Sequence, residues 1–280
     1  MKQFFDKFKD LEKTFEYNKD KYKEIFNNYL PLDEIEDSVC TNNNTLDENF
    51  RLAFNLYEKD SHILTMPELI YARTKVNNDH FLNQESYATH TEDHVGLDVD
   101  GLFYKKDTPT LVVTHGGGSV TPDRISDTIK NQSIRSKSTE EEFYNLLKGN
   151  LKYYDGNTKI YEFEEIKDGI QDLPHRYGVA IPLSVVNEYY QNNNDNEFFR
   201  RNGFVNHPLN ICRNGGIENL EEFFENVKSP NDDICVKNIW KSIEPRNYFC
   251  YLNILNKNYE DSNLISLKPK NNFLILNKLH

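Results

Sequence analysis

One segment limits the fold of this chain more than any other: an apolar strand that runs through a glycine-rich loop into a helix. Leu111–Thr114 is β-branched and apolar, and His115 and the glycines Gly116–Gly118 follow it directly. Thr121 and Pro122 then provide an N-cap residue and a first-turn proline, which together are a strong helix start signal. The segment therefore predicts a sheet with helices packed on it.

The remaining periodicity predicts strands and helices in mixed order. β-Branched and aromatic runs predict strands over Ile63–Met66, Leu69–Val76, Ser86–His90, His94–Tyr104, Thr110–His115, Tyr161–Ile166, Leu209–Cys212 and parts of Tyr248–Leu276. Helices are predicted over Asp47–Tyr57, Pro122–Asn131, Thr139–Leu147, Leu183–Tyr190, Asn196–Arg201 and Leu220–Val227. Because strands and helices do not alternate strictly, we expect an α+β fold with a mixed, largely antiparallel sheet, formed as one domain over residues 32–280.

Residues 1–31 carry a separate pattern, an apolar stripe from Phe4 to Tyr29 at spacings of three and four that predicts an amphipathic helix ended by Pro31. Asn18 interrupts the stripe. A polar residue in such a seam is typical of a coiled-coil dimer, so the helix could join two copies of the chain. The alternative is a helix that packs on its own domain.

Charge and composition exclude several classes of function. The 280 residues include 33 Lys and Arg against 45 Asp and Glu, a formal charge of −12, which argues against nucleic acid or an anionic membrane as partner. No apolar run approaches the roughly 20 residues that span a bilayer, and the charged N-terminus lacks a signal-peptide core. Four widely spaced cysteines predict reduced thiols in a cytoplasmic protein.

The densest polar cluster lies between His90 and Asp100. If residues 94–100 are a strand, His94, Asp98 and Asp100 share one face, with the two aspartates about 6–7 Å apart. A hairpin centred between Lys106 and Asp107 would place His115 opposite Asp98.

This face predicts a divalent metal site for zinc, manganese or iron, with His90, His94, Asp98 and Asp100 as ligands. His90 can join only through a turn at 91–93, because four residues of strand span about 13 Å. The alternative is a polar face of an edge strand, without a ligand.

Two glycine-rich loops predict binding of an anion. In the first, backbone N–H groups of Gly116, Gly117 and Gly118 at a helix start, with Arg124, would hold a phosphate or carboxylate. In the second, Arg213 stands beside Gly215 and Gly216, and Asn219 is a candidate N-cap. Either loop could instead be a tight turn only.

Two functions follow as expectations. The first is a metal-dependent hydrolase of a phosphorylated or nucleotide-like small molecule, with His115 and Asp98 as catalytic residues. The second is a non-enzymatic protein that binds an anionic ligand or a partner through the glycine loops and the N-terminal helix. His115–Gly118 also matches the oxyanion-hole segment of lipase-like α/β-hydrolases, but no Gly-x-Ser-x-Gly elbow follows, which argues against an esterase of that type.

Overall fold

The computed structural model describes the residues from 47 to 276 with gaps. The described ranges are 47–48, 50–51, 62–77, 87–131, 136–151, 157–168, 176–192, 198–199, 205–226, 236–237, 249–255, 272–273 and 275–276. The amphipathic helix predicted over residues 1–31 lies outside them.

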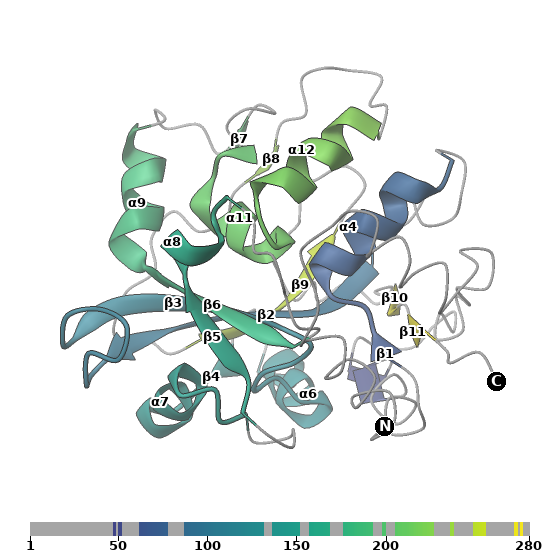
Figure 1. Ribbon diagram of the computed structural model, residues 1–280. Coiled ribbons are helices and arrows are strands. Elements are labelled where there is room, and N and C mark those ends of the chain that lie inside the picture. Colours follow the sequence, from purple (N-terminus) through teal and green to yellow (C-terminus); the bar gives the residue numbers. More distant parts are fainter. Residues whose placement is uncertain are drawn as a thin grey trace.

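A seven-stranded sheet occupies the centre of the described part (Figure 1). Its main path runs β4 (Ser136–Lys137), β9 (Phe249–Leu255), β2 (Tyr87–Asp98), β3 (Thr108–His115), β6 (Tyr177–Pro182) and β5 (Lys159–Glu162), and β10 (Asn272–Phe273) also pairs with β2. The pairs β2–β3, β2–β9, β3–β6 and β4–β9 are antiparallel, whereas β5–β6 and β10–β2 are parallel. The predicted mixed, largely antiparallel sheet is therefore confirmed.

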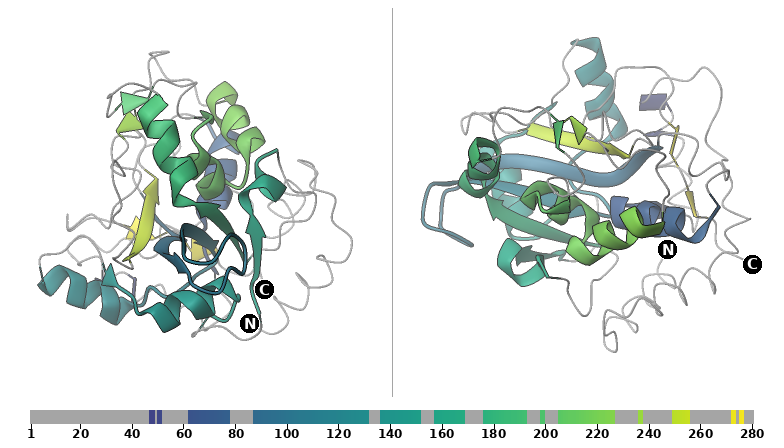
Figure 2. Two further views of the ribbon diagram at one scale, coloured as in Figure 1. Left: turned by 90° about the vertical axis from the view of Figure 1, so that its left-hand side faces the viewer. Right: turned by 90° about the horizontal axis from the view of Figure 1, so that it is seen from above.

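Helices cover both faces of this sheet (Figures 1 and 2). On one face lie α6 (Pro122–Lys130) and α7 (Glu140–Leu147). On the other lie α4 (Met66–Lys75), α8 (Phe163–Ile166), α9 (Leu183–Asn192), α11 (Pro208–Asn214) and α12 (Ile217–Asn226). Two small sheets pair β1 (His62–Ile63) with β11 (Ile275–Leu276) and β7 (Phe198–Phe199) with β8 (Val236–Lys237). The fold class is α+β, as predicted.

The alternation of β3 divides the apolar core between the two faces. Leu111 and Val113 belong to the larger cluster, which includes residues of α4, α11 and α12. Val112, between them in sequence, belongs to a smaller cluster with Phe143 and Leu146 of α7. Because neighbouring strand residues point to opposite faces, one continuous apolar run fills both layers.

The predicted helices at Pro122–Asn131, Thr139–Leu147 and Leu183–Tyr190 are confirmed as α6, α7 and α9. Helix α7 begins where Thr139 accepts a hydrogen bond from the Glu142 backbone N–H, while the Glu142 carboxylate accepts one from the Thr139 N–H. This reciprocal capping box satisfies two N–H groups that the helix itself leaves unpaired.

Two predicted strands are wrong, because both segments are helices. Leu69–Val76 lies mostly in α4, whose capping box joins Thr65 and Glu68. Leu209–Cys212 lies in α11, where the His207 side chain caps the N-terminus and Gly215, at φ +74°, ends the helix in the left-handed conformation. In both segments the start signal, a proline in the first turn after a capping residue, outweighs β-branched content.

Other boundaries also differ from the predicted ones. Phe198–Phe199 is a strand within the stretch predicted as the helix Asn196–Arg201. The strands predicted at Ser86–His90 and His94–Tyr104 are one strand, β2, which ends at Asp98. Asn219 is not the N-cap of α12, which begins at Ile217. Tyr161–Ile166 is divided between β5 and α8.

The predicted hairpin register is wrong as well. Asp98 pairs with Thr108, and His115 pairs with Thr91, so His115 lies on the opposite face from His94 and Asp98. The reason is the Asp98 carboxylate, which accepts hydrogen bonds from the backbone N–H groups of residues 102–104 at 2.8–3.0 Å and folds the connection into a longer loop. A shift by an odd number of residues moves a strand side chain to the other face.

Candidate functional site

Four consecutive polar residues of β2, from Thr91 to His94, belong to two networks, one on each face of the sheet. The first, which we call the sealed network, consists of Thr91, Asp93, His115 and Arg213. Its members are 0% exposed. Arg213 of α11 donates two hydrogen bonds, from Nε and Nη2, to the Asp93 carboxylate, with Nε 3.0 Å from Oδ2. This buried, two-pronged ion pair attaches α11 to the centre of the sheet.

His115 is held at both ring nitrogens within the sealed network. Its Nε2 lies 3.0 Å from the carbonyl oxygen of Cys212, and its Nδ1 lies 3.0 Å from the Thr91 hydroxyl. A carbonyl oxygen can only accept, so the proton belongs on Nε2 and Nδ1 accepts from Thr91. The Thr91 oxygen in turn accepts from the Met66 N–H of α4 at 2.9 Å. His115 thus joins β3, α11 and α4, and its ring packs against that of Tyr177, with the ring centroids 4.4 Å apart and the planes tilted by 31°.

Burial also sets the protonation of two other groups beside the sealed network. Burial, with the nearby Arg213 charge, lowers the pKa of His207 to about 3. A neutral His207 can accept at Nδ1 from the Leu209 N–H, at 3.1 Å, which is its capping bond. Burial and the Asp93 charge raise the pKa of the Cys212 thiol, so it stays protonated, as expected for a packed side chain.

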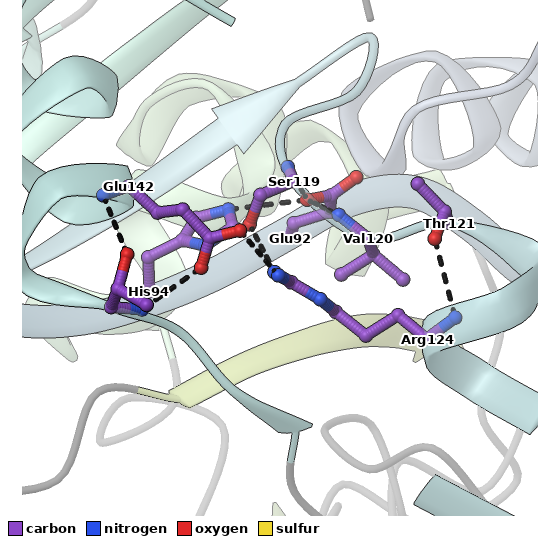
Figure 3. A network of polar contacts seen from close by, with 8 residues as sticks. Glu92, His94, Ser119, Val120, Thr121, Arg124 and Glu142 are labelled. Carbon is purple, nitrogen blue, oxygen red and sulfur yellow. Dashed lines mark hydrogen bonds and ion pairs between the residues drawn. The ribbon is translucent and has the colours of Figure 1, made fainter. Parts of the chain in front are cut away.

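The second network, which we call the open network, consists of Glu92, His94, Ser119, Arg124 and Glu142 (Figure 3). It lies on the face covered by α6 and α7. Glu92 and His94 are 0% and 1% exposed, Ser119 is partly exposed, and the Arg124 and Glu142 side chains are 19% and 30% exposed. The network therefore runs from the interior of β2 to the molecular surface.

Glu92 is the inner end of the open network. Its Oε2 accepts hydrogen bonds from the backbone N–H groups of Ser119 and Val120, at 2.8 and 3.0 Å. The same oxygen lies 3.2 Å from Nε2 of His94. Its other oxygen, Oε1, is buried and has no hydrogen-bond partner among the residues that the structure describes.

His94 and Ser119 continue the open network outward. His94 Nε2 also lies 3.3 Å from the Thr114 hydroxyl, and its Nδ1 lies 3.5 Å from Ser119 Oγ. Arg124 donates from Nη1 to Ser119 Oγ at 3.1 Å and from Nη2 to Glu142 at 2.6 Å. Figure 3 shows the resulting chain of contacts, from β2 through the glycine loop to α6 and α7.

The first glycine loop packs directly onto this network. A Cβ on Gly118 would lie 2.4 Å from Glu92 Oε2 and 2.7 Å from His94 Nε2. Gly116 and Gly117 have φ of +76° and +106°, and their N–H groups donate to the His90 carbonyl oxygen. With the Ser119 and Val120 N–H groups directed to Glu92, the anion that this loop holds is a carboxylate of the chain itself.

The structure distributes the other predicted site residues among different places. Asp98 organises its hairpin loop through its carboxylate, and Asp100 is exposed on that loop. His90 is buried, with its ring edge-on to Phe50 at 6.0 Å. Gly215 and Gly216 are buried at the end of α11. His94 and Arg124 alone of the predicted set belong to the open network.

No three His, Cys, Asp or Glu side chains come together as a metal-binding group in the part of the chain that the structure describes. Metal binding by His90, His94, Asp98 and Asp100 stays a prediction. Nor does any helix among the described residues have the length and apolar character needed to cross a membrane.

Sequence reasoning missed Glu92, Ser119 and Glu142. Glu92 carries a readable signal, since it stands two residues before His94 and so shares its strand face. Ser119 directly follows the glycine run, but its direction depends on the loop's left-handed glycines. Glu142 is recognisable as the N3 residue of a capping box, although its contact with Arg124 depends on how α6 and α7 pack.

Comparison with known proteins gives one useful likeness. No family model matches the chain, and no curated protein matches it. A solved structure, described as "Accommodation of massive sequence variation in Nanoarchaeota by the C-type lectin fold", is 17% identical, with a TM-score of 0.55 over 84% of this chain and 93% of that chain. At this identity the likeness is one of fold alone: the α+β architecture described above resembles that of a structure assigned to the C-type lectin fold.

Proposed function

We propose that this chain is a binding protein for a small molecule with a carboxylate or phosphate group, which it holds at Arg124 beside Ser119. The observation that carries the proposal is the contact between Arg124 and Glu142. The Glu142 carboxylate accepts a hydrogen bond from Arg124 Nη2 at 2.6 Å, and the Arg124 and Glu142 side chains are 19% and 30% exposed. A ligand carboxylate or phosphate can replace that of Glu142 with the same bonding geometry.

Arg124 suits this role better than the other predicted anion ligands. Arg213 is fully buried and committed to Asp93. The N–H groups of Gly116 and Gly117 are committed to the His90 carbonyl oxygen. Arg124 instead lies where α6, α7 and the glycine loop meet, with its guanidinium between a hydroxyl and a carboxylate.

The likeness to a structure of the C-type lectin fold supports ligand binding as a function of this chain. The description of that structure concerns a fold that accommodates massive sequence variation.

The proposal is tested by thermal unfolding in inorganic phosphate, with sodium chloride at matched ionic strength as the reference. A dissociation constant of about 1 mM would add about 1.4 kcal/mol to the stability at about 10 mM phosphate. Arg124→Gln should remove this gain. Glu142→Gln should increase it, because the competing charge is lost while glutamine keeps the capping box.

Arg51→Gln is the matched control. Arg51 forms an ion pair with Asp123 of α6 at 2.7 Å but lies 51% exposed and outside the open network. Its variant should keep the phosphate effect. Two results would contradict the proposal. One is an equal loss of the phosphate-dependent stabilisation in Arg51→Gln and Arg124→Gln, and the other is a wild type that phosphate stabilises no more than sodium chloride does.

A further inference from the structure

We infer that Ser119 is a nucleophile for acyl transfer, with His94 as its general base and Glu92 as the residue that positions His94. This inference rests on the proposed function to the extent that the substrate is a bound small molecule held near Arg124. The substrate class is a carboxylic ester or thioester.

The contacts of the open network favour the proton positions that such a reaction needs. Glu92 Oε2 accepts from two backbone N–H groups and lies at ion-pair distance, 3.2 Å, from His94 Nε2, and an acceptor-only carboxylate at that nitrogen favours the tautomer with the proton on Nε2. Nδ1 of His94 is then an acceptor, and it faces Ser119 Oγ at 3.5 Å. Catalytic hydrogen bonds are often this long in ligand-free enzymes and tighten in the complex with substrate.

Arg124 directs the serine hydroxyl toward the histidine. Its Nη1 donates to Ser119 Oγ at 3.1 Å, and His94 Nδ1 lies 3.5 Å from the same oxygen, within reach of the hydroxyl proton. The same guanidinium stands next to the atom that attacks, where it can stabilise the negative oxygen of a tetrahedral intermediate.

Exposure to solvent increases from the buried Glu92 and His94 to Ser119, as a site with a nucleophile at its surface requires. Glu92 and His94 are 0% and 1% exposed, whereas Ser119 is partly exposed and can meet a substrate. Gly118 brings the serine loop against both buried groups, because a Cβ there would overlap Glu92 and His94. A nucleophile elbow of the α/β-hydrolase type is not needed, since the glycine loop itself presents the serine.

The reaction balances with water as the only co-reactant. Ser119 Oγ bonds to the carbonyl carbon as its proton passes to His94 Nδ1. The bond from that carbon to the oxygen or sulfur of the leaving group breaks, and the leaving group takes the proton from His94. Water then attacks the acyl-serine while His94 Nδ1 takes its proton. The bond from the acyl carbon to Ser119 Oγ breaks, Oγ takes the proton back from His94, and the carboxylic acid is released.

A fluorophosphonate probe tests this on the full-length protein. Ser119 Oγ would displace fluoride from phosphorus, and the adduct is measured by intact mass and located by peptide mapping. We expect one adduct, at Ser119. It should be absent in Ser119→Ala and unchanged in Ser126→Ala, a partly exposed serine on α6 that is the matched control. His94→Gln should slow labelling by about 100-fold or more.

Glu92→Gln separates positioning from structural support. It should slow labelling of Ser119 while the phosphate effect on unfolding persists, because Arg124 keeps its place. A merely structural Glu92 would change both readouts together. An unlabelled wild type, or equal labelling of Ser119→Ala and wild type, overturns the inference.

The two proposals fail in different ways. A phosphate effect that needs Arg124, without labelling of Ser119, overturns the nucleophile and supports binding alone. Labelling of Ser119 without any phosphate effect supports the nucleophile and removes the anion site.

Discussion

The two faces of β2 carry polar side chains of the same kinds but use them differently. On one face, Asp93, Arg213 and His115 are fully buried and their bonds connect β2, β3, α4 and α11. On the other, Glu92 and His94 continue through Ser119 to Arg124 at the surface. The difference teaches that two buried histidines on neighbouring strands can be in different positions: His115 is enclosed by packed elements, whereas the contacts of His94 lead to the surface. We therefore assign a chiefly stabilising role to the sealed network and the proposed chemistry to the open one.

Breaking the sealed ion pair should produce the largest effect on stability. Asp93→Leu leaves the Arg213 guanidinium buried without its counter-charge, which should cost about 3–5 kcal/mol in the free energy of unfolding. On the open face, Arg124→Gln breaks a partly exposed pair and should cost less than about 1 kcal/mol. Urea unfolding of the two variants measures the difference.

The double variant Asp93→Leu/Arg213→Met sharpens this test. It removes both charges and should regain most of the lost stability, because the penalty comes from the uncompensated charge. Similar costs for Asp93→Leu and Arg124→Gln would show that the two networks do not differ as described.

Gly118→Ala should give the next largest effect, and on the open face. The new Cβ would lie within 2.7 Å of three polar side-chain atoms, from Glu92, His94 and Thr114, so the loop must move away. Overpacking of this kind costs about 1–3 kcal/mol. Gly178→Ala on β6 is the control, since its Cβ would chiefly meet the flexible Ile160 Cδ1 at 2.5 Å. Equal unfolding midpoints for wild type and Gly118→Ala would argue against tight packing of the loop.

A smaller effect on stability is expected from pH, through His207 beside the sealed network. His207 has a pKa of about 3 in the folded protein against 6.5 for the ordinary group. Between these values the unfolded chain binds a proton that the folded one does not, so stability falls as pH falls below 6.5. The loss from pH 7 to pH 5 should be about 1–2 kcal/mol.

His207→Asn isolates this contribution. Asparagine can accept the Leu209 N–H as His207 does, but it does not titrate. The variant should therefore lose less stability than wild type between pH 7 and pH 5, whatever its stability at pH 7. Parallel curves for the two proteins would show that His207 is not responsible.

Local sequence signals predict much of this fold, and the failures have identifiable causes. The prediction of a strand, a glycine loop and a helix over residues 111–130 is correct, because the β-branched run, the glycines and the helix start signal all indicate the same structure. The segments at 69–76 and 209–212 fail because capping by Thr65 and His207, and burial against the sheet, outweigh β propensity. The prediction of the site failed because it depended on the register between β2 and β3. The Asp98 carboxylate fixes that register by accepting hydrogen bonds from backbone N–H groups four to six residues further along the chain.

The open network is assigned the reactivity of this protein, and the sealed network its stability. The most direct test is the rate of fluorophosphonate labelling of Ser119 per folded molecule, measured in His94→Gln and His115→Gln. Both remove a buried histidine next to the glycine loop, and the folded fraction is measured separately by circular dichroism. We predict that His115→Gln lowers stability but is labelled at close to the wild-type rate, whereas labelling of His94→Gln is slower by about 100-fold or more. Equal rates in the two variants would contradict the account.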